Sequence, residues 1–455
     1  MERDNKMGYM PIGKLVTTMS APMIISMLVQ ALYNVVDSMF VSHVSENALT
    51  AVSLAFPAQN LMIGVATGTA VGVNALLSKS LGEKNYKKAN AIAENGVFLA
   101  FVGFLIFLIF GLFGTRVFFT AQTDVEEIIN CGVDYLTVCC CFSFGIFGQI
   151  IFERLMQSTG RTFYTMITQG AGALINIVLD PIFIFGYLGM PKMGAKGAAV
   201  ATVIGQIAAF IIAVILNHKK NPDIRLSLRE FRPDRKMIGR IYAIGIPSII
   251  MVAVGSVMTF SINKIVIAFT ATAAAVFGVY FKLQSFVFMP IFGLNNGVIP
   301  IIAYNYGAKN RTRVTKTIKT SLLFVFCFMF VGLAVMQLIP DKLLSIFNAS
   351  PEMTEIGVSA LRTISLSYIV AGFSVVMISV FQAFGKGLFS MFISIARQLV
   401  VLVPAAYLLA NTGVLNNVWW AFPIAEVMSV TVAAVFFIHL YKTVIKKLPE
   451  NGEEI

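Results

Sequence analysis

Residues 15–42 read LVTTMSAPMIISMLVQALYNVVDSMFVS, an apolar run with no basic residue and a single acidic one, Asp37. A helix of about 20 mainly apolar residues crosses the hydrocarbon core of a bilayer, so this run predicts a membrane span. Similar runs recur along the chain, separated by charged residues or by proline and glycine. The predicted spans lie near 15–42, 50–78, 91–114, 130–152, 162–187, 197–216, 241–269, 274–303, 317–339, 356–382, 388–410 and 417–441. The sequence therefore predicts an all-α integral membrane protein with twelve transmembrane helices.

The composition agrees with a membrane protein. Of the 455 residues, 57% are hydrophobic and 12% are charged, whereas soluble domains are roughly 45–50% apolar and about 25% charged. These values argue against a soluble enzyme, a nucleic-acid-binding protein and a disordered scaffold. The five cysteines show neither metal-ligand nor disulfide spacing. The first apolar run is too long for a cleaved signal sequence, so we expect it to remain as a span.

The basic residues are distributed unevenly over the predicted loops. If successive spans alternate in direction, 26 of the 34 lysines and arginines fall on one side of the membrane and four on the other. The remaining four lie within or beside spans. Basic loops mark the cytoplasmic side, so we expect both termini in the cytoplasm and the protein in the cell membrane. The net charge of +12 thus reflects topology and requires no nucleic-acid partner.

The two halves of the chain align with each other at an offset of 225 residues. The offset pairs Pro22 with Pro247, Phe56 with Phe281, Gln59 with Gln284, Gly68 with Gly293 and Gly72 with Gly297. Because each half has an even number of spans, the halves form two parallel, pseudo-symmetric six-helix lobes. We expect an N-terminal lobe at 1–216, a basic cytoplasmic linker at 217–240, a C-terminal lobe at 241–441 and a tail at 442–455. Such repeats are typical of transporters that bind substrate between the lobes and alternate their access.

Polar residues inside the predicted spans are candidates for function, because burying them in a bilayer is costly. Gln30, Asn34 and Asp37 follow the spacing i, i+4, i+7 and therefore share one helix face. Asn176 and Asp180 also lie four residues apart, before a proline that leaves a backbone carbonyl unpaired. Carboxylate, amide and carbonyl oxygens are ligands suited to Na⁺. The same carboxylates could instead bind a proton, and the sequence leaves the two ions open.

Other polar residues in or near spans support several interpretations. Gln30, Asn263, Lys264 and Lys282 are candidates for lining a substrate cavity, although either lysine could instead pair with Glu426. Three further charges are expected to be structural. We expect Glu153 and Arg154 to reach the membrane surface or to pair near a span end, and Arg397 to join two helices. The four-residue spacing of three glycines predicts close helix packing; these are Gly64, Gly68 and Gly72.

The chain contains no Gly-x-x-x-x-Gly-Lys-[Ser/Thr] phosphate-binding loop and no cluster with catalytic-metal spacing. We therefore expect no enzyme, no ATP and no cofactor beyond a coupling ion, H⁺ or Na⁺. Transport would then use an ion gradient, which supplies about 2.3 kcal/mol per charge for each 100 mV, plus any concentration difference.

An ordered set of short stretches covers nearly the whole chain and resembles a known family. The stretches are residues 22–37, residues 48–57, Gly82-Glu-Lys-Asn85, Gln157-Ser-Thr-Gly-Arg161, Asn176-Ile-Val-Leu-Asp-Pro181, Gly197-Ala-Ala-Val-Ala-Thr202, Tyr304-Asn-Tyr-Gly-Ala308 and Trp420-Ala-Phe-Pro-Ile-Ala-Glu426. Together they resemble the multidrug and toxic compound extrusion (MATE) family, and most closely its MepA-like bacterial branch. The resemblance implies a V of two six-helix lobes and the antiport of bulky organic cations against H⁺ or Na⁺.

The resemblance also implies a cation site in the first lobe. Its residues would be Asp37, Asn176, Asp180 and Thr202, which could hold Na⁺. The NorM-like branch of the family also carries acidic residues in spans seven and ten. In this chain span seven has Asn263 and Lys264 instead, and span ten has no acid between residues 364 and 384. We therefore expect no second-lobe coupling site of that kind.

The leading hypothesis is a secondary active multidrug antiporter, monomeric and surrounded by membrane lipids, that exports drugs or organic cations by alternating access. The alternative is a flippase for lipid-linked oligosaccharides of the same superfamily, with Lys264 and Lys282 attracting a phosphate-bearing head group. A membrane-embedded enzyme or receptor is a third class, and the chain lacks the catalytic constellation that such an enzyme needs.

Overall fold

A computed structural model of the chain describes residues 5–227, 231–347 and 349–450. This part of the chain is almost entirely helical and contains no strand. Ten of its helices are long and apolar enough to cross a membrane, and two bent helix pairs raise the number to twelve if each pair is one span. The twelve predicted spans therefore correspond to these ten helices and two pairs.

The first half of the chain forms α1 to α9. Their bounds are α1 Lys6–Tyr9, α2 Ile12–Ser42, α3 Glu46–Gly82, α4 Tyr86–Phe113, α5 Thr115–Thr120, α6 Glu126–Cys141, α7 Phe144–Ser158, α8 Thr162–Phe185, the 3₁₀ turn η1 Tyr187–Gly189 and α9 Ala195–Lys220. The second half forms α10 to α19. Their bounds are α10 Arg235–Ile267, α11 Ala271–Gly307, α12 Arg311–Leu338, α13 Pro340–Ser345, α14 Pro351–Ser365, α15 Tyr368–Ala383, α16 Gly387–Ile395, the π-helix η2 Ala396–Leu402, α17 Val403–Ala410, α18 Leu415–Val418, α19 Ala421–Thr443 and the 3₁₀ turn η3 Ile445–Lys447.

The sequence repeat is visible in the helix bounds themselves. Helices α3 and α11 both begin and end 225 residues apart, and so do α4 and α12. The turns that follow α3 and α11 also match, because Lys84 and Lys309 both have a φ of 53°. Few residues other than glycine adopt this left-handed conformation. The offset therefore describes repeated backbone structure as well as repeated residues.

Two of the predicted spans are broken. Helices α6 and α7 meet at an angle of 44°, and α14 and α15 meet at 53°. At the second break the Ser367 hydroxyl donates to the Ile364 carbonyl oxygen at 2.6 Å, a local bond that competes with the helical ladder. The prediction of continuous helices at 130–152 and 356–382 was wrong there, because hydropathy detects an apolar run but not a two-residue break within it.

The predicted linker is shorter than expected. Helix α9 continues to Lys220 and α10 begins at Arg235, so both helices extend into the predicted 217–240 segment. The Asp234 side chain accepts hydrogen bonds from the backbone amides of Lys236 and Met237 and caps α10. Basic composition ended the predicted spans too early, because lysine and arginine are also good helix formers.

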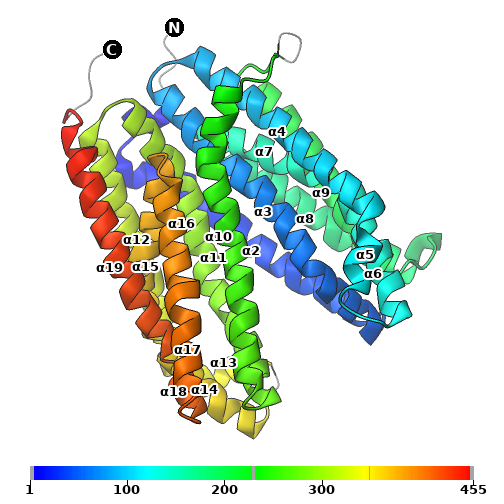
Figure 1. Cartoon of the computed structure of the whole chain (residues 1–455). Helices are drawn as coiled ribbons and strands as arrows, with labels where there is room; N and C mark the ends of the chain where they lie inside the picture. The colour runs from blue at the N-terminus through cyan, green and yellow to red at the C-terminus, as the bar shows by residue number, and fades with distance from the viewer. Residues whose placement is uncertain (1–4, 228–230, 348, 451–455) are drawn as a thin grey trace.

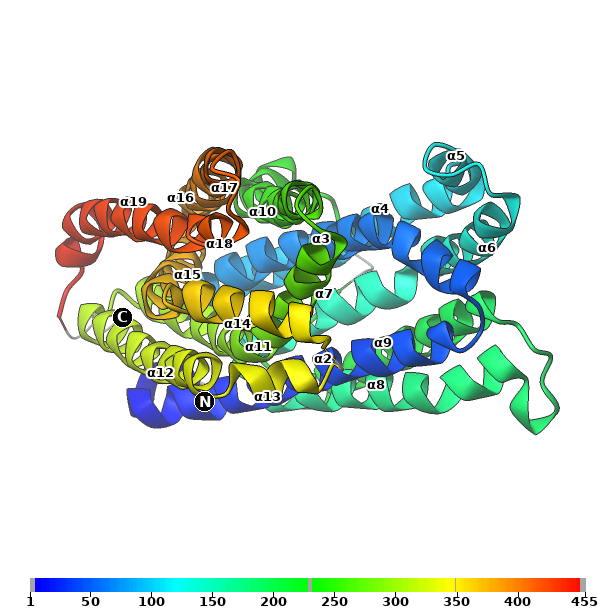
Figure 2. The same cartoon turned by 90° about the horizontal axis from the view of Figure 1, so that it is seen from below.

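The helices form two lobes arranged as a V (Figure 1). The lobes approach each other at the end where α1 and η3 lie, and they diverge toward the opposite end (Figure 1). The view from below shows α4 to α9 on one side and α12 to α19 on the other (Figure 2). This arrangement agrees with the predicted V of two six-helix lobes.

Helices α2 and α10 each contribute to the hydrophobic cores of both lobes. Leu15 and Met19 at the start of α2 are buried in the core of the second lobe, whereas Val41 at its end is buried in the core of the first. Helix α10 does the reverse, since Ile241 lies in the first core and Ile262 in the second. Each lobe is therefore completed by half a helix from the other.

Small residues bring the backbones of the lobes together. A Cβ atom on Gly68 would lie 2.9 Å from the carbonyl oxygen of Gly245 in α10, and one on Gly72 would meet the Ile241 carbonyl oxygen. The repeat-related Gly297 of α11 lies in the same way against Ser20 of α2. This close approach confirms the packing predicted for the glycine face of α3, and it places that face between the lobes.

Candidate ion and substrate site

The four residues implicated in cation binding lie on three helices of the first lobe. Asp37 is on α2, Asn176 and Asp180 are on α8, and Thr202 is on α9. The Asn176 amide nitrogen donates to Thr202 Oγ1 at 3.2 Å and to Asp180 Oδ1 at 3.5 Å. The carboxyl groups of Asp37 and Asp180 are close enough to interact electrostatically. The fold thus brings together residues that are up to 165 positions apart in the sequence.

This cluster contains oxygen atoms that are buried but unpaired. Asp37 Oδ1, Asn176 Oδ1 and Asp180 Oδ2 have no hydrogen-bond partner. Buried polar atoms nearly always have one, so three exceptions in one cluster point to a ligand, an ion or a proton. Oxygen atoms suit a hard cation. The described residues contain no group of three or more histidine, cysteine or acidic side chains that could hold a metal ion.

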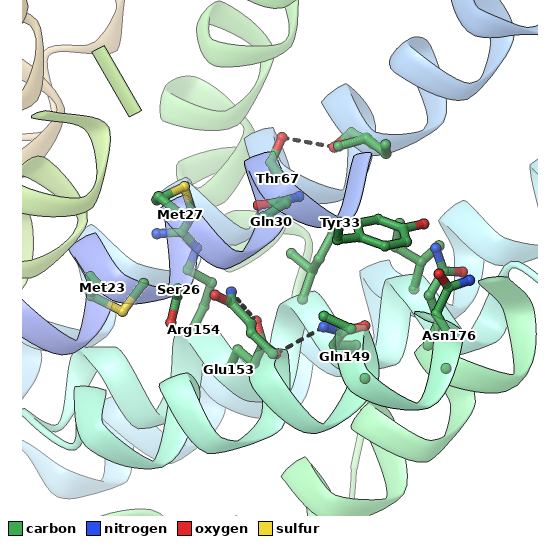
Figure 3. Close-up of a pocket in the computed structure, with 18 of the residues that line it drawn as sticks. Met23, Ser26, Met27, Gln30, Tyr33, Thr67, Gln149, Glu153, Arg154 and Asn176 are labelled. Atoms are coloured by element: carbon green, nitrogen blue, oxygen red, sulfur yellow. Dashed lines mark hydrogen bonds between the residues drawn. The ribbon is translucent and has the colours of Figure 1, made fainter. Parts of the chain in front are cut away.

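A cavity of about 160 Å³ adjoins the cluster, and Tyr33, Asn176 and Thr202 line it. Tyr33 lies between the cavity and α9, with its hydroxyl oxygen 3.5 Å from Thr202 Oγ1 (Figure 3). The predicted cavity residue Gln30 lies on the same helix as Tyr33 and lines the cavity. Asn34, the remaining polar residue of that predicted face, is exposed.

Glu153 is a second buried carboxyl group in the wall of this cavity. It is 3% exposed and accepts hydrogen bonds from Thr168 Oγ1 at 2.8 Å, Gln169 Nε2 at 2.7 Å and Gln149 Nε2 at 3.0 Å. The Gln149 contact is visible in Figure 3. The expectation that Glu153 reaches the membrane surface or pairs with its neighbour was wrong, because three neutral donors on α7 and α8 hold it inside. Gln149, one turn earlier, was the sequence signal that could have indicated this site.

Arg154 faces the second lobe. Its Nη1 atom donates to Gln157 Oε1 at 2.8 Å and to Asn296 Oδ1 of α11 at 2.9 Å. The guanidinium group therefore contacts the other lobe and does not extend to the membrane surface. Asn296 was not predicted as a functional residue, since an asparagine in an apolar run does not reveal its partner.

A larger cavity of about 460 Å³ lies on the side of the second lobe. Phenylalanine, methionine and amide side chains form most of its wall, and Thr67 and Asn296 line both cavities. The two cavities therefore adjoin each other between the lobes. The predicted candidates Asn263, Lys264 and Lys282 line neither of them.

The structure decides which basic residue pairs with Glu426. Arg397 Nη1 donates to Glu426 Oε1 at 3.0 Å, which joins η2 to α19. The expectation that Arg397 links two helices is therefore confirmed, and the alternative pairing of Glu426 with a lysine is not observed. Lys264 is exposed, and Lys282 Nζ lies 5.9 Å from the centre of the Phe347 ring.

The fold, the buried carboxyl groups and the adjoining cavities between two lobes define a membrane transporter and not an enzyme. A family model described as MatE matches residues 22–182 and 247–408, so the chain belongs to the MatE family. The matched segments begin 225 residues apart and agree with the internal repeat. Family membership confirms the resemblance found in the sequence motifs.

Relatives and solved structures of this family match almost the whole chain. The multidrug export protein MepA of Staphylococcus haemolyticus (strain JCSC1435) is 26% identical over 416 residues, which is 91% of each chain. MepA of Staphylococcus aureus (strain NCTC 8325 / PS 47) is 25% identical over 448 residues, or 97% of each chain. The outward-facing structure of a multidrug resistance MATE family transporter of the MOP superfamily superposes with a TM-score of 0.92 at 24% identity, covering 98% of this chain and 100% of that one.

Proposed function

We propose that this protein is a secondary active multidrug antiporter, which exports drugs or organic cations in exchange for H⁺ or Na⁺. The names of the MepA relatives support multidrug export. The observation that carries ion coupling is the set of buried, unpaired oxygen atoms on Asp37, Asn176 and Asp180. With Thr202 beside Asn176, this set can hold Na⁺ through oxygen ligands or take up a proton on a carboxylate.

Helix α2 provides a physical route from the ion to the lobes. Asp37 lies in the half of α2 that packs in the first lobe, whereas Leu15 and Met19 at the other end are buried in the second. A cation that neutralises the carboxyl groups changes the cost of burying them, and therefore changes the preferred position of α2 against α8. Because α2 is shared, such a movement alters the packing between the lobes.

We further propose that the protein resides in the cell membrane with both termini in the cytoplasm. The diverging end of the V then faces outward, and the described arrangement corresponds to an outward-facing state. Access from the cytoplasm would require the contact between Arg154 and Asn296 to separate. We also propose that one chain suffices for transport. Cysteine labelling at exposed loop positions tests the topology, and light scattering of the purified protein tests the monomer.

The decisive experiment measures ethidium efflux from proteoliposomes containing wild type or Asp37→Asn, with pH and Na⁺ gradients imposed separately. We expect efflux by the wild type under one gradient and at least a tenfold loss in the variant, because asparagine keeps the shape but loses the charge. Asp124→Asn, which changes an exposed aspartate in a loop, is the matched control and should retain transport.

The two gradients identify the coupling ion, since only the gradient of the coupled ion drives efflux. Full gradient-driven efflux by Asp37→Asn would contradict the role of this site. Absence of efflux by folded wild type under both gradients would contradict the antiporter and favour the flippase, which is then tested with lipid-linked oligosaccharides.

A further inference from the structure

The larger cavity has an unusual balance of charge for a site that would bind cations. Arg397 is the single charged residue among those that line it. The other polar residues in its wall are neutral, among them Gln284, Asn295 and Gln398. A cationic ligand would therefore meet a like charge in this cavity and no lining carboxylate.

Arg397 is held by one side only. Among the described residues its guanidinium group donates one hydrogen bond, to Glu426, and its buried Nε atom has no partner. The side chain retains 21% of its surface exposed. A guanidinium group has five N–H donors, so most of its capacity is unused.

The acidic partner lies behind Arg397 and away from the cavity. Glu426 lies on α19 and is not among the residues that line the space. The ion pair is thus oriented with its positive end toward the cavity. Arg397 belongs to η2, a π-helical segment within the predicted span 388–410. Short π-helical segments inside α-helices are rare and occur frequently at functional sites.

The rest of the cavity can accommodate a flat apolar body. Phe281, Phe288 and Phe292 provide ring surfaces, and Met251 and Met289 provide adaptable ones. The volume of about 460 Å³ lies within the range of sites for drug-sized ligands.

We propose that the second-lobe cavity binds planar aromatic compounds that carry a carboxylate, zwitterions included, with Arg397 as the binding group for the carboxylate. An arginine recognises a carboxylate well because its parallel N–H donors match the two oxygen atoms. The inference extends the proposed export function by naming a substrate class and the subsite that selects it.

The test compares two dyes that differ only at the acid. Rhodamine 110 has a free carboxylate, and rhodamine 123 is its methyl ester. Binding to the purified full-length protein in lipid nanodiscs is measured by fluorescence polarisation. The variant Arg397→Gln with Glu426→Gln removes both charges, so that no unpaired charge is left buried. Arg362→Gln, which removes an exposed arginine of α14, is the matched control.

We expect the wild type and the control to bind rhodamine 110 about tenfold more tightly than rhodamine 123, and the double variant to lose this preference. The affinity for rhodamine 123 should change less than threefold. Arg397→Lys, which keeps the charge but not the fork of donors, should lower the preference to an intermediate value.

Three outcomes would overturn the proposal: equal binding of the two dyes by the wild type, a preference that survives in the double variant, or loss of the preference in Arg154→Gln alone. The last result would place the carboxylate in the first cavity, which Arg154 lines. Ethidium efflux separates this proposal from the proposed function. If the wild type exports ethidium under a gradient but shows no preference for the acid, export stands and the subsite is wrong.

Discussion

The two lobes share a backbone but differ in where they carry charge. Helices α3 and α4 recur as α11 and α12 at the same offset, and the glycines between the lobes recur with them. At that offset Asp37 falls on Ile262 and Asp180 falls on Ala405. Glu153 falls on Ile378, so none of the three buried acids of the first lobe is repeated.

The second lobe has charges of its own at positions where the first has none. Arg397 corresponds to Gly172 at the same offset. The first cavity therefore contains carboxyl groups near its wall, and the second contains a guanidinium group. The comparison teaches that packing preserves the apolar and small residues of both repeats, whereas the ionisable residues are free to specialise each lobe.

The largest effect should come from neutralising an acid that only one lobe carries. We expect Asp180→Asn to reduce gradient-driven ethidium efflux in proteoliposomes at least tenfold, because it removes a carboxylate from the proposed ion site. Ala405→Ser alters the corresponding position of the second lobe and should retain transport. Equal losses in both variants would mean that the lobes do not divide the work as proposed.

A feature that both lobes share should respond alike in both. Gly72→Ala and Gly297→Ala place a Cβ atom against the Ile241 carbonyl oxygen and Ser20, respectively. We expect each to destabilise the protein by about 1–3 kcal/mol, the usual cost of overpacking. Thermal unfolding in detergent checks this, with Gly170→Ala, which has open space, as the control. A loss in only one of the two variants would contradict the symmetry of the interface.

The buried carboxyl group of Glu153 should matter more than its apolar counterpart. Glu153→Gln keeps the size but replaces an oxygen acceptor with an amide donor, which faces the donors of Gln149, Thr168 and Gln169. We expect a loss of about 1–2 kcal/mol in stability. Ile378→Leu, at the repeat-related position, should cost less. Unchanged thermal stability of Glu153→Gln would show that the amide can turn to satisfy these donors.

The smallest effect should come from an exposed ion pair of the first lobe. Arg116 and Glu126 lie 2.8 Å apart, but their side chains are 61% and 64% exposed. Arg116→Gln should therefore change stability by less than about 1 kcal/mol, because solvent screens such pairs. Arg397→Gln alone breaks the buried pair with Glu426 and should destabilise the protein by clearly more. Similar losses would show that burial does not distinguish these two pairs.

Much of the architecture could be predicted from the sequence because a bilayer imposes a simple rule on each segment. Apolar length identified the spans, and the 225-residue offset identified the two lobes. The spacing of Asn176 and Asp180 on one helix also indicated a polar site. The two-residue breaks in the α6–α7 and α14–α15 pairs escaped prediction, since they leave the mean hydropathy unchanged.

Pairings between helices were the part that could not be predicted. The sequence left Glu426 with three possible basic partners, and only the packing of η2 against α19 selected Arg397. Glu153 was expected at the membrane surface because its donors Thr168 and Gln169 lie on the next helix. The contact of Arg154 with Asn296 crosses between lobes and leaves no local signal.

The sequence by itself determined that this protein is a membrane-spanning helical repeat with acids in its first half. These properties are local, because each depends on whether a short segment can be transferred from water into lipid. The tertiary structure decided which polar groups meet, how α2 and α10 are shared between the lobes, and that Arg397 faces a cavity. Such contacts depend on the angles and rotations at which distant helices pack, which the residues of one helix do not specify alone.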